Sequence, residues 1–209
     1  MKQILLIAAL LLNAATGQAS IKLQESWKNP NYSPRPLKTI LALGMSNHLE
    51  RRADFEVALA SKMARPGITA IAGTDILLRP TPGPLNRVYL KEQIEAYNID
   101  AIVVCRLIKV KPRATEVPGE PYLLPYYTSF YAYYEAVAPI VYSPDYLVIE
   151  KTVQVESTVY AVTPTGSTLI WTGTSDTFDP SSAHQVIREV VELVVKELEK
   201  LEILAQPAK

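Results

Sequence analysis

The order of apolar patterns in the first half of the chain constrains the fold more than any other feature of the sequence. Largely apolar runs at 39–45, 68–73 and 101–110, the last unbroken over 101–105, are typical of buried strands. Between them, residues 48–65 and 85–97 carry apolar side chains every three or four positions, as amphipathic helices do. Strands that alternate with helices favour parallel pairing through right-handed crossovers. This half therefore predicts a strand–helix–strand–helix–strand unit of the α/β class.

The second half of the chain has a different pattern. Residues 146–162 and 167–178 alternate between apolar and polar side chains, which predicts strands with one face toward water. Proline and glycine in the four residues between them favour a tight hairpin. Asp179 and Pro180 then resemble the cap and first position of a helix with a long apolar stripe. We expect one α/β domain over 38–205, a mixed sheet packed by helices on at least one face, with residues 206–209 as a tail.

The first nineteen residues have the features of a secretory signal peptide. Lys2 precedes an uninterrupted apolar run from Ile4 to Leu12, and the small residues Gly17 and Ala19 stand at positions −3 and −1 of a cleavage site before Ser20. An uncleaved anchor is the alternative, but the run is shorter than the roughly 20 residues that span a bilayer. The sequence therefore predicts export to the periplasm or beyond, with residues 1–19 removed and no transmembrane segment left.

The single cysteine and the balanced charge set further limits. Cys105 is far from the cleavage point, so the lipid anchor of a bacterial lipoprotein is not expected, and one cysteine cannot form an internal disulfide. Its apolar surroundings favour a small buried hydrophobe over a reactive or dimer-forming thiol. The chain has 21 basic and 21 acidic residues, and loss of Lys2 leaves about one net negative charge. Without a basic excess, nucleic acid is not an expected partner.

Prolines mark two further segments. Residues 20–37 are polar and contain Pro30, Pro34 and Pro36, which predicts an extended N-terminal arm. Residues 111–145 form a tyrosine- and proline-rich insertion. Five of its prolines argue against a helix, namely Pro118, Pro121, Pro125, Pro139 and Pro144. Eight of the twelve tyrosines lie between Tyr122 and Tyr146.

Tyrosine combines a broad apolar ring with a polar tip, a combination that suits partner surfaces. One interpretation is an exposed arm that contacts a protein or a glycan. The alternative is that the segment folds back and its rings cover the sheet. The candidate partner-binding residues are Tyr126, Tyr127, Phe130, Tyr131, Tyr133, Tyr134 and Tyr142.

The sequence contains no strong catalytic or cofactor signature. His48 and His184 are the only histidines, and neither has a neighbour at the spacing of metal ligands. No G-x-S-x-G elbow is present to indicate a serine hydrolase. We therefore predict no catalytic residues, no cofactor and no metal site.

The predicted element order resembles that of a small α/β domain found in bacterial envelope proteins. Residues 38–44 open this fold, 97–104 enter its third strand and 169–173 end its hairpin. The pattern is similar to the amino-terminal domain of the TolB translocation protein, the curli-secretion lipoprotein and the lipoprotein activators of penicillin-binding proteins. The resemblance implies an envelope location and a non-enzymatic binding role, as an assembly or accessory factor. The alternatives are a small envelope hydrolase or ligand-binding enzyme, and a self-assembling subunit.

Overall fold

A six-stranded mixed sheet forms the centre of the computed structural model, which describes residues 21–78, 83–111, 128–141, 152–178 and 180–204. The strand order is β1-β6-β5-β4-β2-β3. The strands are β1 (Ile21–Lys28), β2 (Thr39–Met45), β3 (Thr69–Ala72), β4 (Ala101–Lys111), β5 (Thr152–Thr163) and β6 (Gly166–Phe178). The helices are α1 (Leu49–Met63), α2 (Gly73–Ile76), α3 (Arg87–Ala96), α4 (Phe130–Val141) and α5 (Ala183–Lys200). The predicted signal peptide and C-terminal tail lie outside the described residues.

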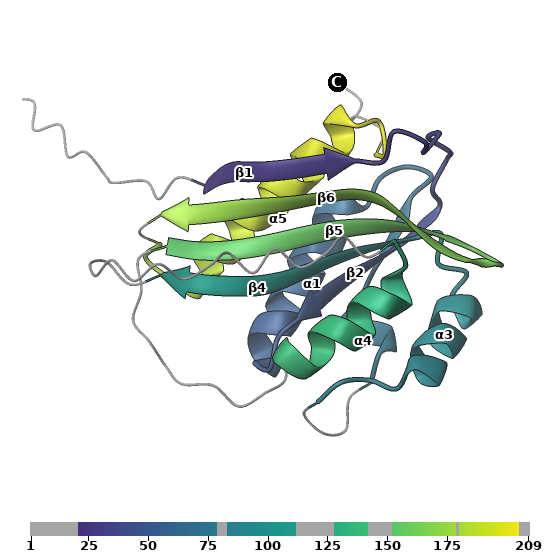
Figure 1. Ribbon diagram of the computed structural model, residues 1–209, viewed down its shortest axis with the longest axis horizontal. Helices are drawn as coiled ribbons and strands as arrows, with labels where there is room; N and C mark the ends of the chain where they lie inside the picture. Colours follow the sequence, from purple (N-terminus) through teal and green to yellow (C-terminus); the bar gives the residue numbers. More distant parts are fainter. Residues whose placement is uncertain (1–20, 79–82, 112–127, 142–151, 179, 205–209) are drawn as a thin grey trace, which may run out of the picture.

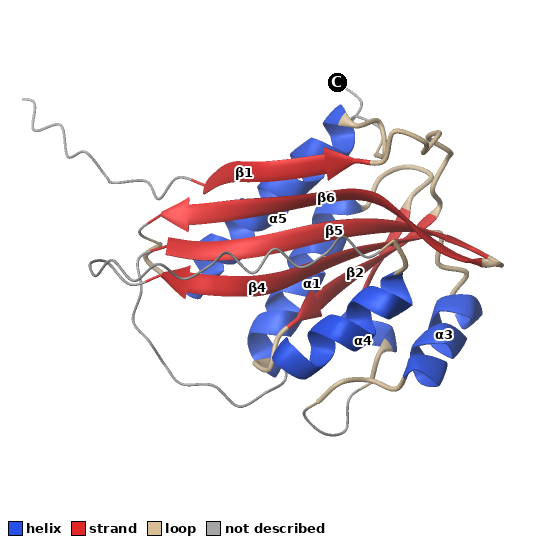
Figure 2. Cartoon of the chain, viewed as in Figure 1, coloured by secondary structure: helices blue, strands red, loops and turns tan. Residues whose placement is uncertain are grey.

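Helices cover both faces of the sheet, which confirms the predicted mixed α/β fold. Figure 1 shows α1 and α5 behind the sheet and α4 in front of it, and Figure 2 separates the strands from the helices by colour. One apolar core joins α1 and α5 to the sheet around Leu59, Ile170 and Val194. A second core on the other face joins α3 and α4 to it around Leu90 and Phe130.

The predicted parallel unit is present. β2 lies between β3 and β4 and is parallel to both, with Thr39 opposite Thr69 and Ile40 opposite Ala101. The crossover through α1 packs on one face of the sheet and the crossover through α3 on the other. The carboxyl ends of β2 and β4 therefore form a topological switch point, a common ligand-binding place in α/β sheets.

The predicted hairpin is also present, but its polar face is not open to water. β5 and β6 pair antiparallel around a turn that ends at Gly166, whose φ of 149° is rare for residues with a side chain. Thr158, on the face expected to be wet, is buried, and Glu156 contacts a tyrosine of α4. The expectation was wrong because α4 covers this part of the face.

The N-terminal segment is a sheet strand for part of its length. Ile21–Lys28 pairs antiparallel with β6, so the expected arm contributes an edge strand. The three prolines that suggested an arm all follow this strand. Between the last two of them, the Arg35 guanidinium donates to the Val162 carbonyl at 2.7 Å, which ties the connection to the hairpin.

Part of the tyrosine- and proline-rich insertion is helical, which corrects the expectation of no helix. Phe130–Val141 forms α4, and the only one of the five prolines within it is Pro139, in its last turn. A proline near the end of a helix removes a single hydrogen bond, to the carbonyl four residues earlier, and leaves the preceding turns intact. The other four prolines lie outside the described residues.

The C-terminal helix begins later than predicted. Its cap is Ser182, whose hydroxyl accepts from the Gln185 amide at 3.2 Å, and helical structure starts at Ala183. Asp179, the predicted cap, lies outside the described residues. None of the helices in the described part of the chain is long and apolar enough to cross a membrane.

Candidate functional site

Four of the seven candidate residues lie on α4; Tyr126, Tyr127 and Tyr142 fall outside the described residues. Phe130, Tyr133 and Tyr134 follow the three- and four-residue spacing of one helix face, and each is 3% exposed or less. The ring centroids of Phe130 and Tyr133 lie 5.9 and 6.1 Å from that of Tyr160 on β5. These three side chains cover the sheet, so contact with a partner is left to Tyr131 among the four.

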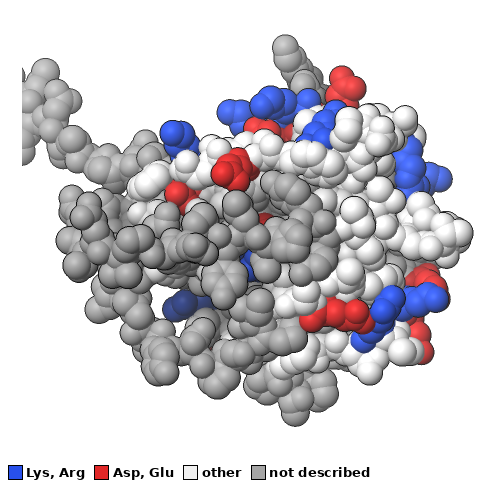
Figure 3. Space-filling model, in the orientation of Figure 1, with Lys and Arg blue, Asp and Glu red and all other residues white. Residues whose placement is uncertain are grey.

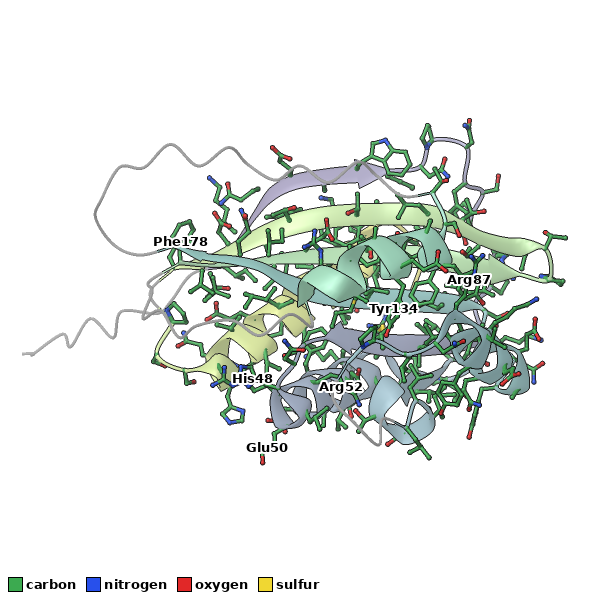
Figure 4. All side chains as sticks on the ribbon, turned by 60° about the horizontal axis from the view of Figure 1, so that its bottom comes forward. His48, Glu50, Arg52, Arg87, Tyr134 and Phe178 are labelled. Carbon is green, nitrogen blue, oxygen red and sulfur yellow. The ribbon has the colours of Figure 1, made fainter. Side chains whose placement is uncertain are left out.

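Tyr131 lines a cleft of about 200 Å³ between α3 and α4. Leu90 and Tyr134 form part of its floor, and the Tyr134 hydroxyl accepts from the Leu85 amide at 2.8 Å. This hydrogen bond holds the segment before α3 against α4. Figure 4 shows Arg87 and Tyr134 in the same region of the molecule, one from each helix. The remaining lining residues are Pro84, Glu135 and Ala138.

An arginine, a tyrosine and a glutamate form the rim of this cleft. The Arg87 guanidinium carbon lies 5.3 Å from the centroid of the Tyr131 ring, within cation–π range. Arg87 Nη1 also lies 3.2 Å from Glu135 Oε1, in an exposed ion pair. In Figure 3, basic and acidic side chains lie next to each other over α3, at the lower right. The rim can thus present both a donor and an acceptor to a bound group.

Two apolar side chains near the start of α3 are exposed. Leu78, before α3, and Val88, in its first turn, are both largely exposed, and neither lines the cleft. The Leu78 amide donates to the hydroxyl of Tyr89 at 3.2 Å, which keeps that residue against α3.

A buried ion pair lies beneath α4, close to the switch point. Arg106 on β4 and Glu156 on β5 are register partners, and Nε and Oε2 are 2.7 Å apart. The Tyr133 hydroxyl donates to the same oxygen at 2.7 Å. Burial, followed by the charge of Glu156, raises the pKa of Tyr133 well above its ordinary value, so the hydroxyl keeps its proton. This network joins α4 to two strands.

A second acidic side chain occupies the other face of the switch point. Glu56 on α1 is fully buried and accepts from the Gly44 amide at 2.9 Å and from the Thr74 hydroxyl. Burial raises the pKa of Glu56 above its usual range. Arg52 Nε lies 3.7 Å from this carboxylate. The switch point is thus filled by the chain's own side chains on both faces.

The histidines and the cysteine are separate from these networks. His48 precedes α1 without capping it through its side chain, and His184 Nδ1 lies 3.8 Å from Asp54 on the opposite side of the sheet from the cleft. Cys105 is buried and its thiol contacts the Ser157 hydroxyl at 3.1 Å. No group of three or more potential metal ligands occurs among the described residues.

The charged residues of these sites were not among the residues predicted from the sequence. Arg87 and Glu135 meet only because α3 and α4 are neighbours, and neither segment has a sequence pattern that predicts this contact. Arg106 carried a weak signal, since it interrupts an apolar strand with a charge, whereas Glu156 lies on the alternating polar face predicted for its strand. The register of the strands, which places the two residues opposite each other, is what identifies them as a buried pair.

Comparisons with solved structures give neighbours of similar fold, while no protein-family model and no curated protein matches the sequence. The PelC dodecamer from Paraburkholderia phytofirmans is 15% identical, with a TM-score of 0.44 over 91% of this chain and 100% of that one. A variant of that dodecamer is 12% identical, with a TM-score of 0.42 over 86% and 98%. Lipoprotein GNA1162 from Neisseria meningitidis is 10% identical, with a TM-score of 0.36 over 78% and 98%. At these values the likeness concerns the arrangement of elements alone.

Proposed function

We propose that this chain is an exported, non-enzymatic protein of the bacterial envelope that binds a protein partner through the α3–α4 cleft. The observation that carries the proposal is the cleft itself, with its apolar floor and its rim of Arg87, Tyr131 and Glu135. Its exported location rests on the sequence of residues 1–19.

The size of the cleft favours a side chain of a partner over a free small molecule. About 200 Å³ is below the roughly 300–1,000 Å³ of most small-molecule sites. A recess of that size accommodates one aliphatic or aromatic side chain, as anchor pockets at protein interfaces do.

The rim favours a protein over a glycan. Sugars stack on the open faces of aromatic rings, but Arg87 already lies over one face of Tyr131. Phe130 meets the same ring edge-on, with 5.4 Å between centroids. What remains accessible is a ring edge with a hydroxyl, next to a guanidinium and a carboxylate, which suits a peptide with its own polar groups.

Site-specific crosslinking in intact cells tests the proposal. A photoreactive phenylalanine in place of Tyr131 should give a crosslinked product whose tryptic peptides include those of a second protein. The matched control is the same replacement at Tyr97, an exposed tyrosine that ends α3 and is not part of the cleft lining. A product at Tyr131 that is lost with Glu135→Arg supports the cleft. Equal products at both positions, none at Tyr131, or a product whose added mass is removed by glycosidases would contradict it.

A further inference from the structure

The helical face opposite the cleft carries a second, larger groove. α1 and α5 run parallel there, because Asp54 and His184 meet near their starts and Arg65 pairs with Glu199 beyond the end of α1. Figure 4 shows the start of α1, marked by His48 and Glu50, beside α5. The groove between the helices has a volume of about 650 Å³ and is open to solvent.

The floor of this groove is apolar and its edges are charged. Val57, midway along α1, is 50% exposed and faces Ile187 and Val191 across the groove. Exposed charged residues border this floor on each helix. The border residues are Asp54 and Lys62 on α1, and Arg188 and Glu192 on α5.

The charges have a symmetric arrangement of opposite sign. Asp54 and Lys62 lie two turns apart, about 12 Å, on either side of Val57 and Ala58. Arg188 and Glu192 are again of opposite sign and lie one turn apart. Lys62, Arg188 and Glu192 take part in none of the ion pairs found in the described part of the chain.

We propose that a second copy of this chain docks on the α1–α5 groove around a two-fold axis perpendicular to the helices. The rotation lays α1 antiparallel on α1 of the second copy, so Asp54 faces Lys62 of that copy and the reverse contact forms at the other end. Only a surface whose charges change sign about its centre complements itself in this way.

Other occupants fit this pattern less well. An anionic membrane surface selects a face of one positive sign, whereas this face carries both signs in equal measure. Binding of a helix from another protein would not require Asp54 and Lys62 to lie at equal distances, with opposite charges, on the two sides of one centre. α1 is about 22 Å long, and two helices side by side span roughly 20 Å, an area at the low end for stable association. The dimer is therefore concentration-dependent.

Sedimentation velocity of the purified protein with charge-reversal variants tests the proposal. The unmodified protein should dimerise as its concentration rises. Asp54→Lys alone places two basic side chains against each other across the interface, and Lys62→Asp alone places two acidic ones together. Each variant should therefore weaken dimerisation by about tenfold or more. A mixture of the two variants should restore it as a heterodimer, because every facing pair is then of opposite sign.

The control reverses charge on the other face of the sheet. Lys91 and Glu95 form an exposed pair on α3, so Lys91→Asp and Glu95→Lys match the test substitutions in type and should leave the dimer unchanged. A protein that stays monomeric at all concentrations would overturn the proposal. So would a dimer that neither reversal weakens, or a mixture that does not recover. These outcomes leave the cleft unaffected, because it lies on the opposite face.

Discussion

Cys105 lies between two small residues on neighbouring strands, Gly44 on β2 and Ser157 on β5. These two small neighbours stand beside a thiol that is enclosed between the sheet and the helices packed on it. Burial raises the pKa of Cys105 to about 12. The buried small hydrophobe expected from the sequence is what the structure contains, and the reason is the continuous apolar strand around it.

The raised pKa predicts a pH dependence of stability. Below about pH 9 the thiol is protonated in both states, so its contribution to folding is complete. As the pH rises from about 9 toward 12, the unfolded thiol ionises while the folded one does not, and the free energy of unfolding falls.

Urea unfolding of the unmodified protein and of Cys105→Ala at pH 7.5 to about 10.5 measures the contribution of the thiol as the difference between their free energies of unfolding. The stability advantage of the unmodified protein should shrink above pH 9. A difference that stays constant across the range would contradict the assignment.

At the scale of elements, the first half of the fold could be predicted and the covering of the second half could not. Three of these elements, β2, β3 and β4, are apolar runs, and the helices α1 and α3 have a helical period. Each of these patterns is local and does not depend on distant contacts. α4 also has a helical period, at Phe130, Tyr133, Tyr134 and Val137, but the prolines around it dominated the interpretation. β1 has only a partial alternation, at Ile21, Leu23 and Trp27, and the strand it pairs with, β6, lies far along the sequence.

The same covering explains why the sites were only partly predictable. Tyr131 was among the candidates because tyrosines cluster in that segment. Its partner Arg87 comes from α3, and no property of either sequence segment indicates that contact. The sequence also left open whether the rings bind a partner or cover the sheet, and for Phe130, Tyr133 and Tyr134 the position of α4 on the sheet decides this.

One charged network adds to the apolar contact between α4 and the strands. Arg106→Met should destabilise the protein by about 3 kcal/mol, because Glu156 stays largely buried and the Tyr133 hydroxyl is then its only donor among the described residues. The double variant Arg106→Met, Glu156→Gln removes the unpaired charge and should recover part of that loss. Denaturant midpoints of the three proteins measure both effects. Equal stability of Arg106→Met and the unmodified protein would show that the pair does not hold α4.

At the scale of the whole molecule, the proposed surfaces lie on opposite sides of one sheet. The α3–α4 cleft faces one way and the α1–α5 groove the other, with the two cores between them. A two-fold dimer through α1 would leave both clefts accessible and point them outward. Such a particle could hold two copies of a partner at once, which raises its effective affinity for a partner with repeated sites.

Export predicts a defined mature end. Cleavage after Ala19 leaves Ser20 as the first residue, directly before β1 begins at Ile21. Intact mass and N-terminal sequencing of the protein recovered from the periplasm or medium should show the loss of nineteen residues. Ala19→Arg, which disrupts the small-residue site, should retain them. Recovery of the full-length chain from the unmodified gene would contradict this prediction.

The pairing of β1 with β6 has a consequence for biogenesis. Ile21 lies opposite Thr177, so the strand that leaves the ribosome first waits for one made about 150 residues later. At typical rates of synthesis that interval is roughly 8–30 s. During this interval the backbone amides and carbonyls of β1 lack the β6 partner, so chaperones or incorrect strands can pair with them. The sheet therefore cannot close at this edge until β6 has been made, and a chain arrested before β6 would be a substrate for quality control.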